Sequence, residues 1–113
     1  MSDSELPAVY HVVLYSPGVN WDERFSFHDQ IGAQDHLTYL DALRRRGVLA
    51  MGGPYLDDSG CLAVLQGLSP DQARLIAHAD PAVRIGLLEA EVRPWLVPIE
   101  VAATPAVGSN SAF

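Results

Sequence analysis

The residues with the clearest capacity for chemistry are His36 and Asp80. On a helical wheel, Ala33, Leu40 and Leu43 fall within roughly 60° of His36, so the imidazole points into the middle of an apolar face. A polar ring in that position needs a partner, and Asp80 is the carboxylate that the sequence offers. An aspartate bonded to one ring nitrogen fixes the tautomer and leaves the other nitrogen as a base or donor. We therefore predict a His36–Asp80 pair that transfers protons.

Both residues also have a purely structural interpretation. A histidine on an apolar helix face is often a core or rim residue with satisfied hydrogen bonds. Asp80 precedes Pro81 in the pattern of an N-cap followed by proline at the first helical position. The two roles of Asp80 are compatible, because one carboxylate has two oxygens. An open pocket beside His36 would favour catalysis, whereas a sealed pair or a strongly destabilised His36→Ala variant would favour the structural interpretation.

Hydrophobic periodicity and turn residues predict the elements that position this pair. Strands are expected over residues 8–15, 48–51, 61–66 and 87–96, and helices over 31–46, 70–79 and 81–85. Gly47 supplies the left-handed residue after the first helix, and Ser69 begins a capping box with Gln72. The order β-α-β-β-α-β predicts an α+β fold of the ferredoxin-like type, with an antiparallel sheet and both main helices on one face.

The other face of that sheet has no cover within one chain. A single layer of helices cannot bury both sides of a sheet. We therefore predict a homodimer whose two sheets pack face to face. Pro94 and Pro98 indicate that the last strand becomes an edge at its far end.

Composition limits the classes of partner and compartment. The 113 residues fit one domain, expected over residues 1–100, with a disordered tail over 101–113. With 14 acidic and 7 basic residues the net charge is −7, which disfavours nucleic acid as a partner. The single cysteine, Cys61, allows no internal disulfide. Neither a signal peptide nor an apolar run of membrane-spanning length is apparent, so we expect a cytoplasmic protein without membrane contact.

Four further residues are candidates for substrate binding. Gly53 and Pro54 form a corner where the backbone can approach another group, and Tyr55 follows at the pocket or the dimer seam. Arg84 either binds an anionic substrate or pairs with Asp80 or with an acidic residue at the surface. The polar and aromatic loop over residues 16–30 is either a flap over a pocket or a surface loop pinned by its aromatic side chains.

The sequence gives no indication of a metal or a cofactor. The four histidines, His11, His28, His36 and His78, include no pair with ligand spacing on one element. Phosphate-loop, nucleophile-elbow and dinucleotide motifs are also missing from the sequence. We therefore expect neither a metal nor a cofactor.

Several short motifs resemble, in their order and spacing, the YCII-related (YciI-like) domain family over about residues 8–97. They are His36-Leu37-x-Tyr39-Leu40, Gly47-x-Leu49, Gly52-Gly53-Pro54, Asp80-Pro81, Gly86-Leu87 and Pro94-Trp95. The resemblance implies a dimeric α+β barrel built on the ferredoxin-like unit, with a pocket that holds a His–Asp pair at His36 and Asp80. Most members have no known reaction. A few relatives act on small ring compounds as dehydrochlorinases or, in the wider superfamily, as muconolactone isomerases.

The leading hypothesis is a small cofactor-independent isomerase or lyase that moves a proton on a small cyclic organic substrate. The alternative is a non-catalytic dimeric module that binds a small ligand or a partner and uses the His–Asp pair as a structural hydrogen bond. A third hypothesis, a cofactor-free oxygenase, requires a larger aromatic pocket on which the loop over residues 16–30 closes.

Overall fold

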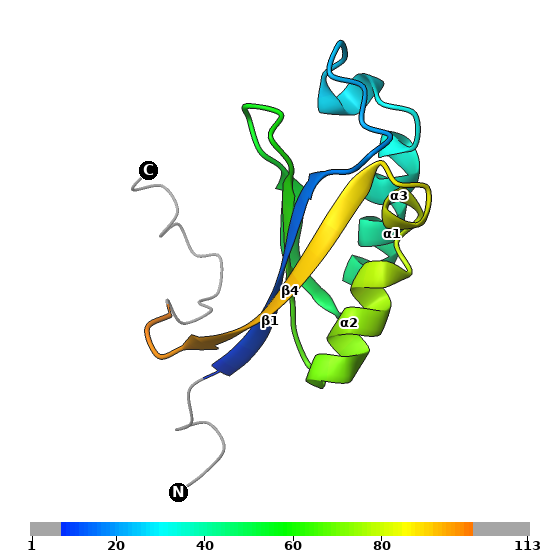
Figure 1. Cartoon of the computed structure of the whole chain (residues 1–113). Helices are drawn as coiled ribbons and strands as arrows, with labels where there is room; N and C mark the ends of the chain where they lie inside the picture. Colours follow the sequence, from blue (N-terminus) through cyan, green and yellow to red (C-terminus); the bar gives the residue numbers. More distant parts are fainter. Residues whose placement is uncertain (1–7, 101–113) are drawn as a thin grey trace, which may run out of the picture.

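The computed structural model describes residues 8–100 and contains one antiparallel sheet with its helices on one side (Figure 1). The strands β1 (Ala8–Pro17), β2 (Leu49–Pro54), β3 (Cys61–Leu65) and β4 (Leu88–Val97) lie in the order β2-β3-β1-β4. The helices are α1 (Ala33–Arg45), α2 (Pro70–His78) and α3 (Pro81–Arg84), with the short 3-10 helix η2 (Phe27–Asp29) before α1. This arrangement confirms the predicted ferredoxin-like α+β fold. The tail predicted over 101–113 lies outside the described residues.

Local signals in the sequence set the ends of the helices. The Ser69 hydroxyl accepts from the Gln72 amide N–H while the Gln72 side chain accepts from the Ser69 N–H, which is the predicted capping box of α2. Gly47 follows α1 with φ +77°, as expected of a residue in the left-handed region. The Tyr39 hydroxyl donates to the Ile76 carbonyl at 2.7 Å and so ties α1 to α2.

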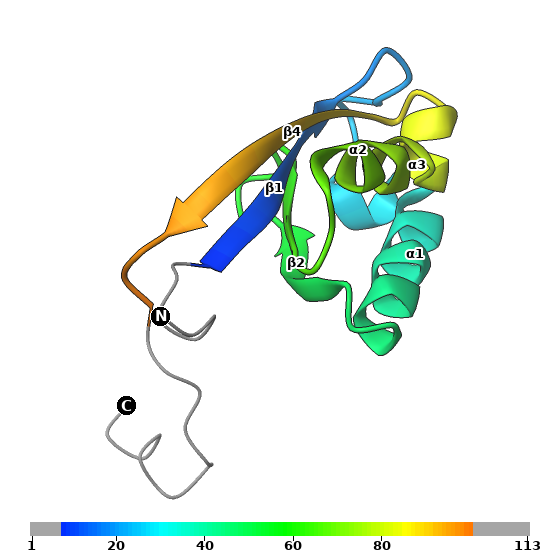
Figure 2. The same ribbon diagram turned by 90° about the horizontal axis from the view of Figure 1, so that it is seen from below.

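The face of the sheet under the helices carries the core. Alternate residues of β1 point toward the helices and are buried: His11, Val13 and Tyr15. Val13 pairs with Ala63 and Tyr15 with Cys61 in β3, and all four are less than 4% exposed. Figure 2 shows the three helices gathered on this side of β1 and β4. None of the helices described is long and apolar enough to cross a membrane.

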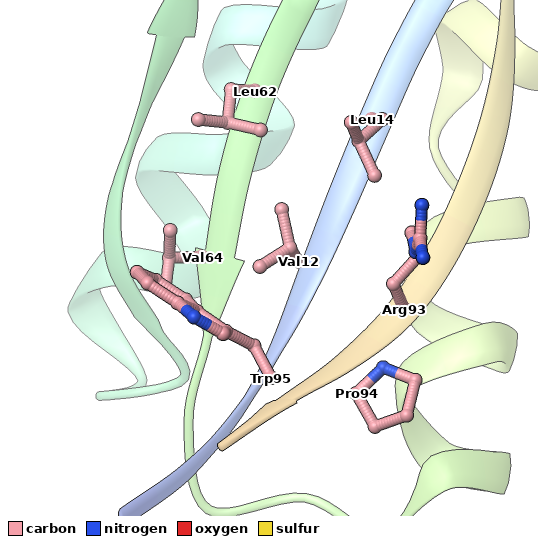
Figure 3. Close-up of a pocket in the computed structure, with 7 residues that line it drawn as sticks. All are labelled: Val12, Leu14, Leu62, Val64, Arg93, Pro94 and Trp95. Carbon is pink, nitrogen blue, oxygen red and sulfur yellow. The ribbon is translucent and has the colours of Figure 1, made fainter. Parts of the chain in front are cut away.

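The opposite face of the sheet has no helix over it. Val12, Leu14, Leu62 and Val64 form its centre, and Arg93 and Trp95 of β4 lie on the same face (Figure 3). These side chains line a shallow groove of about 390 Å³. Trp95 is 47% exposed, so in one chain it belongs to this open face and not to the core. An apolar patch of this kind is typical of an interaction surface.

Tight packing at the β2–β3 hairpin makes one glycine indispensable there. Gly60 has φ +152°, and a Cβ at this position would lie 2.1 Å from the Tyr15 carbonyl oxygen. We expect Gly60→Ala to lower the free energy of unfolding by roughly 2 kcal/mol or more, because the backbone of β1 cannot move aside. Urea unfolding measures this effect.

Gly53→Ala is the matched control, because a Cβ at Gly53 meets nothing within 4 Å. Its stability should stay within about 0.5 kcal/mol of the wild type. Equal stability of the two variants would contradict the packing described at Gly60.

Candidate functional site

His36 and Asp80 meet beneath the helices, as the sequence predicted. The imidazole Nδ1 lies 2.6 Å from Asp80 Oδ2, and both side chains are completely buried. His36 lies in the first half of α1, on the face that points to the core. Asp80 is the N-cap of α3, and its other oxygen, Oδ1, accepts from the Ala82 amide N–H at 2.9 Å. The residue therefore serves both roles that the sequence suggested for it.

These contacts define the hydrogen-bonding state of the imidazole. A carboxylate accepts, so Nδ1 is the nitrogen that carries hydrogen toward Asp80. In the neutral ring Nε2 then holds a lone pair. Nε2 has no hydrogen-bond partner among the described residues, although it is buried. The geometry thus presents an oriented nitrogen base whose reactive atom is not used by the protein itself.

Tyr15 and Cys61, two sheet residues, surround the carboxylate. The Tyr15 ring packs edge-on against the His36 ring with centroids 4.9 Å apart. Burial, together with the nearby Asp80 carboxylate, raises the pKa of Tyr15 well above its usual range. The same two causes, burial first, raise the pKa of Cys61 to about 12. Both groups are therefore protonated at neutral pH, so Cys61 is not a thiolate nucleophile.

Access to His36 is closed in this conformation. The ring is 0% exposed, and Phe27, from η2, packs edge-to-face against it with centroids 5.9 Å apart. Neither His36 nor Asp80 lines any of the five best-formed grooves on the described surface. The open pocket that catalysis requires is therefore not formed in this conformation. A closed His36–Asp80 pair is what the structural interpretation of these residues predicts.

The other predicted site residues lie elsewhere. Gly53, Pro54 and Tyr55 line a groove of about 340 Å³ that also includes Leu62 of the open sheet face. Arg84 is exposed, and within residues 8–100 it forms no ion pair with Asp80. That suggested pairing is wrong, because the Asp80 side chain is completely buried whereas Arg84 is exposed. The role of these four residues in substrate binding stays a prediction.

Sequence reasoning missed two close neighbours of the imidazole. Tyr15 was assigned only to a buried strand, although its alternation with Val13 places it on the helix face of β1. Phe27 lies in the polar and aromatic loop over residues 16–30, for which the sequence predicts no contact with His36. Its contact with His36 depends on how that loop folds back, for which the sequence carries no periodic signal. Among residues 8–100, no three His, Cys, Asp or Glu side chains gather closely enough to hold a metal ion.

The double role of Asp80 predicts a large loss of stability on truncation. Asp80→Ala removes the N-cap of α3 and leaves the buried Nδ1–H of His36 without an acceptor, so we expect a loss of about 2–4 kcal/mol. Ser69→Ala removes only an exposed N-cap and should cost about 1 kcal/mol. Urea unfolding of both variants gives the comparison. A loss in Asp80→Ala no larger than in Ser69→Ala would contradict this account of the pair.

Among solved structures, the chain resembles 5-chloro-2-hydroxyhydroquinone dehydrochlorinase (TftG) from Burkholderia phenoliruptrix AC1100, in its complex with 2,5-dihydroxybenzoquinone. The TM-score is 0.55 and the sequence identity 23%, over 75% of this chain and 92% of the other. At this identity, the likeness supports the shared fold.

Two sequence comparisons agree with the motifs. The chain is 37% identical over 60 residues to the uncharacterized protein YjpA of Bacillus subtilis (strain 168), a match that covers 53% of this chain and 71% of YjpA. The YCII-related domain matches residues 23–96, which include both His36 and Asp80. Because this match spans more than half of the sequence, the chain belongs to the YCII-related domain family.

Proposed function

We propose that this protein is a cofactor-independent enzyme in which His36, oriented by Asp80, transfers a proton on a small cyclic organic substrate. The reaction is an isomerisation or an elimination of the dehydrochlorinase type. The observation that carries the proposal is the buried imidazole whose Nδ1 is held by a carboxylate at 2.6 Å while Nε2 has no protein partner.

The chemistry follows from the free lone pair on Nε2. The nitrogen accepts a proton from a C–H or O–H group of the substrate, and the electron pair of that bond shifts into the ring system. In an isomerisation, Nε2–H returns the proton to a second atom. In an elimination, the electron pair expels the leaving group as an anion, and His36 then releases its proton to solvent. Asp80 stabilises the imidazolium that exists between the two steps.

The similarity to TftG supports the choice of substrate class. That protein is a dehydrochlorinase seen with 2,5-dihydroxybenzoquinone, a small ring compound. Because the two proteins share a fold, a ring compound is the first choice of substrate for this chain.

The alternative is a non-catalytic dimeric module that binds a small ligand or a partner and keeps the pair as a structural hydrogen bond. Its specific support is the complete burial of His36 and Asp80. Burial also changes how the His36→Ala variant should be interpreted. Removing the imidazole would leave a buried carboxylate unpaired, so this variant is destabilised under either function. A smaller change that keeps a donor for Asp80 is needed.

His36→Asn provides that change, because an amide nitrogen replaces Nδ1 and nothing replaces Nε2. We expect the wild type to release chloride from 5-chloro-2-hydroxyhydroquinone and His36→Asn to do so about 10²–10⁴-fold more slowly. Chloride release is measured directly, and NMR follows the His36 ring signals as 2,5-dihydroxybenzoquinone is added. Absence of both chloride release and any change in the His36 signals would favour the non-catalytic module.

We also propose that the protein acts as a homodimer in which the open sheet faces pack together. The face is apolar along its centre, where Val12, Leu14 and Leu62 are only half-buried in one chain. A second copy supplies the same surface about a two-fold axis and so covers the patch on both chains at once.

A charge on the open face tests the dimer. We expect the wild type to sediment with the mass of two chains and Leu14→Lys to sediment as one chain at the same concentration, because a lysine cannot be buried unpaired between two sheets. Leu75→Lys, on an exposed position of α2 that is 72% accessible, is the matched control and should stay dimeric. A wild type that sediments as a monomer in analytical ultracentrifugation would contradict the proposed homodimer.

A further inference from the structure

The cover over His36 belongs to one compact segment, residues 22–30, in the connection between β1 and α1. Its central residue is Phe27, which is 0% exposed and contacts the His36 ring edge-to-face. Trp21 also stacks on Phe27, with centroids 6.4 Å apart and planes 27° from parallel. The phenyl ring thus packs against both an indole and the imidazole, and it is one of the groups that shield the His36 ring from solvent.

This segment is closed upon itself by one side chain. The Gln30 amide donates to the carbonyls of Asp22 and Phe25, at 2.6 and 2.9 Å, while its oxygen accepts from the Asp22 N–H at 3.0 Å. Gln30 is only 6% exposed, so these bonds form the interior of the loop. Because its two ends are tied to each other, the segment can move as a unit without losing its internal hydrogen bonds.

The two flanks of the segment are anchored differently. Before it, Gly18 and Asn20 donate backbone hydrogen bonds to the carbonyls of Leu87 and Gly86, at 2.8 and 2.9 Å. After it, Gly32 has φ +99° and precedes α1, so the chain turns there through a conformation that side chains rarely adopt. The flanks are therefore fixed to the body of the protein or to α1, and motion of residues 22–30 is confined to the segment between them.

A single side chain from outside fastens the Phe27 end. The Asp58 carboxylate, in the turn between β2 and β3, accepts from the Phe27 N–H at 3.0 Å. Asp58 has φ +62°, a left-handed conformation that aspartate tolerates better than most residues. The exposed turn thus holds this carboxylate where it reaches the backbone of the buried aromatic.

We propose that residues 22–30 are a lid, that the substrate takes the place of the Phe27 ring beside His36 Nε2, and that Asp58 is the latch that keeps the lid shut. The identity of the substrate rests on the proposed function, whereas the motion of residues 22–30 does not. The closed form excludes water from the imidazole, and opening breaks the Asp58 bond while the Gln30 bonds inside the lid persist. A ligand that enters must therefore compete with a ring the size of a phenyl group.

The latch is tested by the accessibility of His36, measured as its rate of modification by diethyl pyrocarbonate and resolved by peptide mass spectrometry. Asp58→Gly removes the acceptor and keeps the positive φ. We expect it to raise the rate at His36 by about three- to tenfold, the effect of losing one hydrogen bond. Asp58→Asn keeps a carbonyl acceptor and tolerates the same φ, so its rate should stay within about twofold of the wild type.

His11 is the internal control for general loosening of the fold. It is 3% exposed in β1, four positions from Tyr15 and outside the lid. Its rate should not change in either variant. Equal His36 rates in the wild type and Asp58→Gly, or parallel increases at His11 and His36, would overturn the lid. A selective increase at His36 without any chloride release would keep the lid and reject the proposed reaction.

Discussion

One buried hydrogen bond, between the His36 imidazole and the Asp80 carboxylate, constrains the whole helical layer. Burying a carboxylate costs several kcal/mol unless donors replace the water it loses. Here the two oxygens receive one donor each, from His36 and from the Ala82 backbone. The same carboxylate therefore starts α3 and holds α1 against it. Two helices far apart in the sequence are joined through a single charged group.

Two side chains of the sheet lie close to the Asp80 carboxylate and are neutral. Tyr15 and Cys61 are cross-strand partners on the helix face of β1 and β3, and burial first and the nearby Asp80 carboxylate second raise the pKa of each. Both remain neutral as a result, so no second negative charge competes for the imidazole. Beside the carboxylate, His36 is then the group with a free lone pair. The register of the sheet thus places two neutral side chains beside the His36–Asp80 pair.

Much of this arrangement can be predicted from local sequence signals. The capping residues Ser69 and Asp80 and the left-handed Gly47 follow patterns with direct physical causes, and all three are found as predicted. The meeting of His36 with Asp80 was accessible because an imidazole on an apolar helix face requires a partner. The predicted topology brings the connection that contains Asp80 close to the first helix, and this was enough to identify Asp80 as the partner of His36.

The features that could not be predicted from the sequence are those that depend on irregular backbone. Residues 22–30 contain no repeat from which a fold can be inferred, and their shape depends on Gln30 bonding to carbonyls inside the loop. The position of Phe27 over His36 follows from that shape. Arg84 illustrates the reverse error, since its spacing from Asp80 suggested an ion pair. The Asp80 carboxylate is completely buried, whereas the Arg84 side chain is exposed, so the two do not pair.

The burial of His36 and its proposed chemistry are compatible once the unsatisfied nitrogen is considered. A side chain needed only to donate to Asp80 would be served by a hydroxyl, without a second buried polar atom. Leaving Nε2 unpaired costs about 1–3 kcal/mol, a cost that a ligand bound at this nitrogen would remove. A lid that opens accounts for it, because Nε2 then finds its partner in the substrate.

The lid lies with the helices, whereas the apolar sheet face is on the other side (Figure 1). Access to the imidazole and the proposed assembly of two chains therefore depend on separate surfaces and can be altered independently.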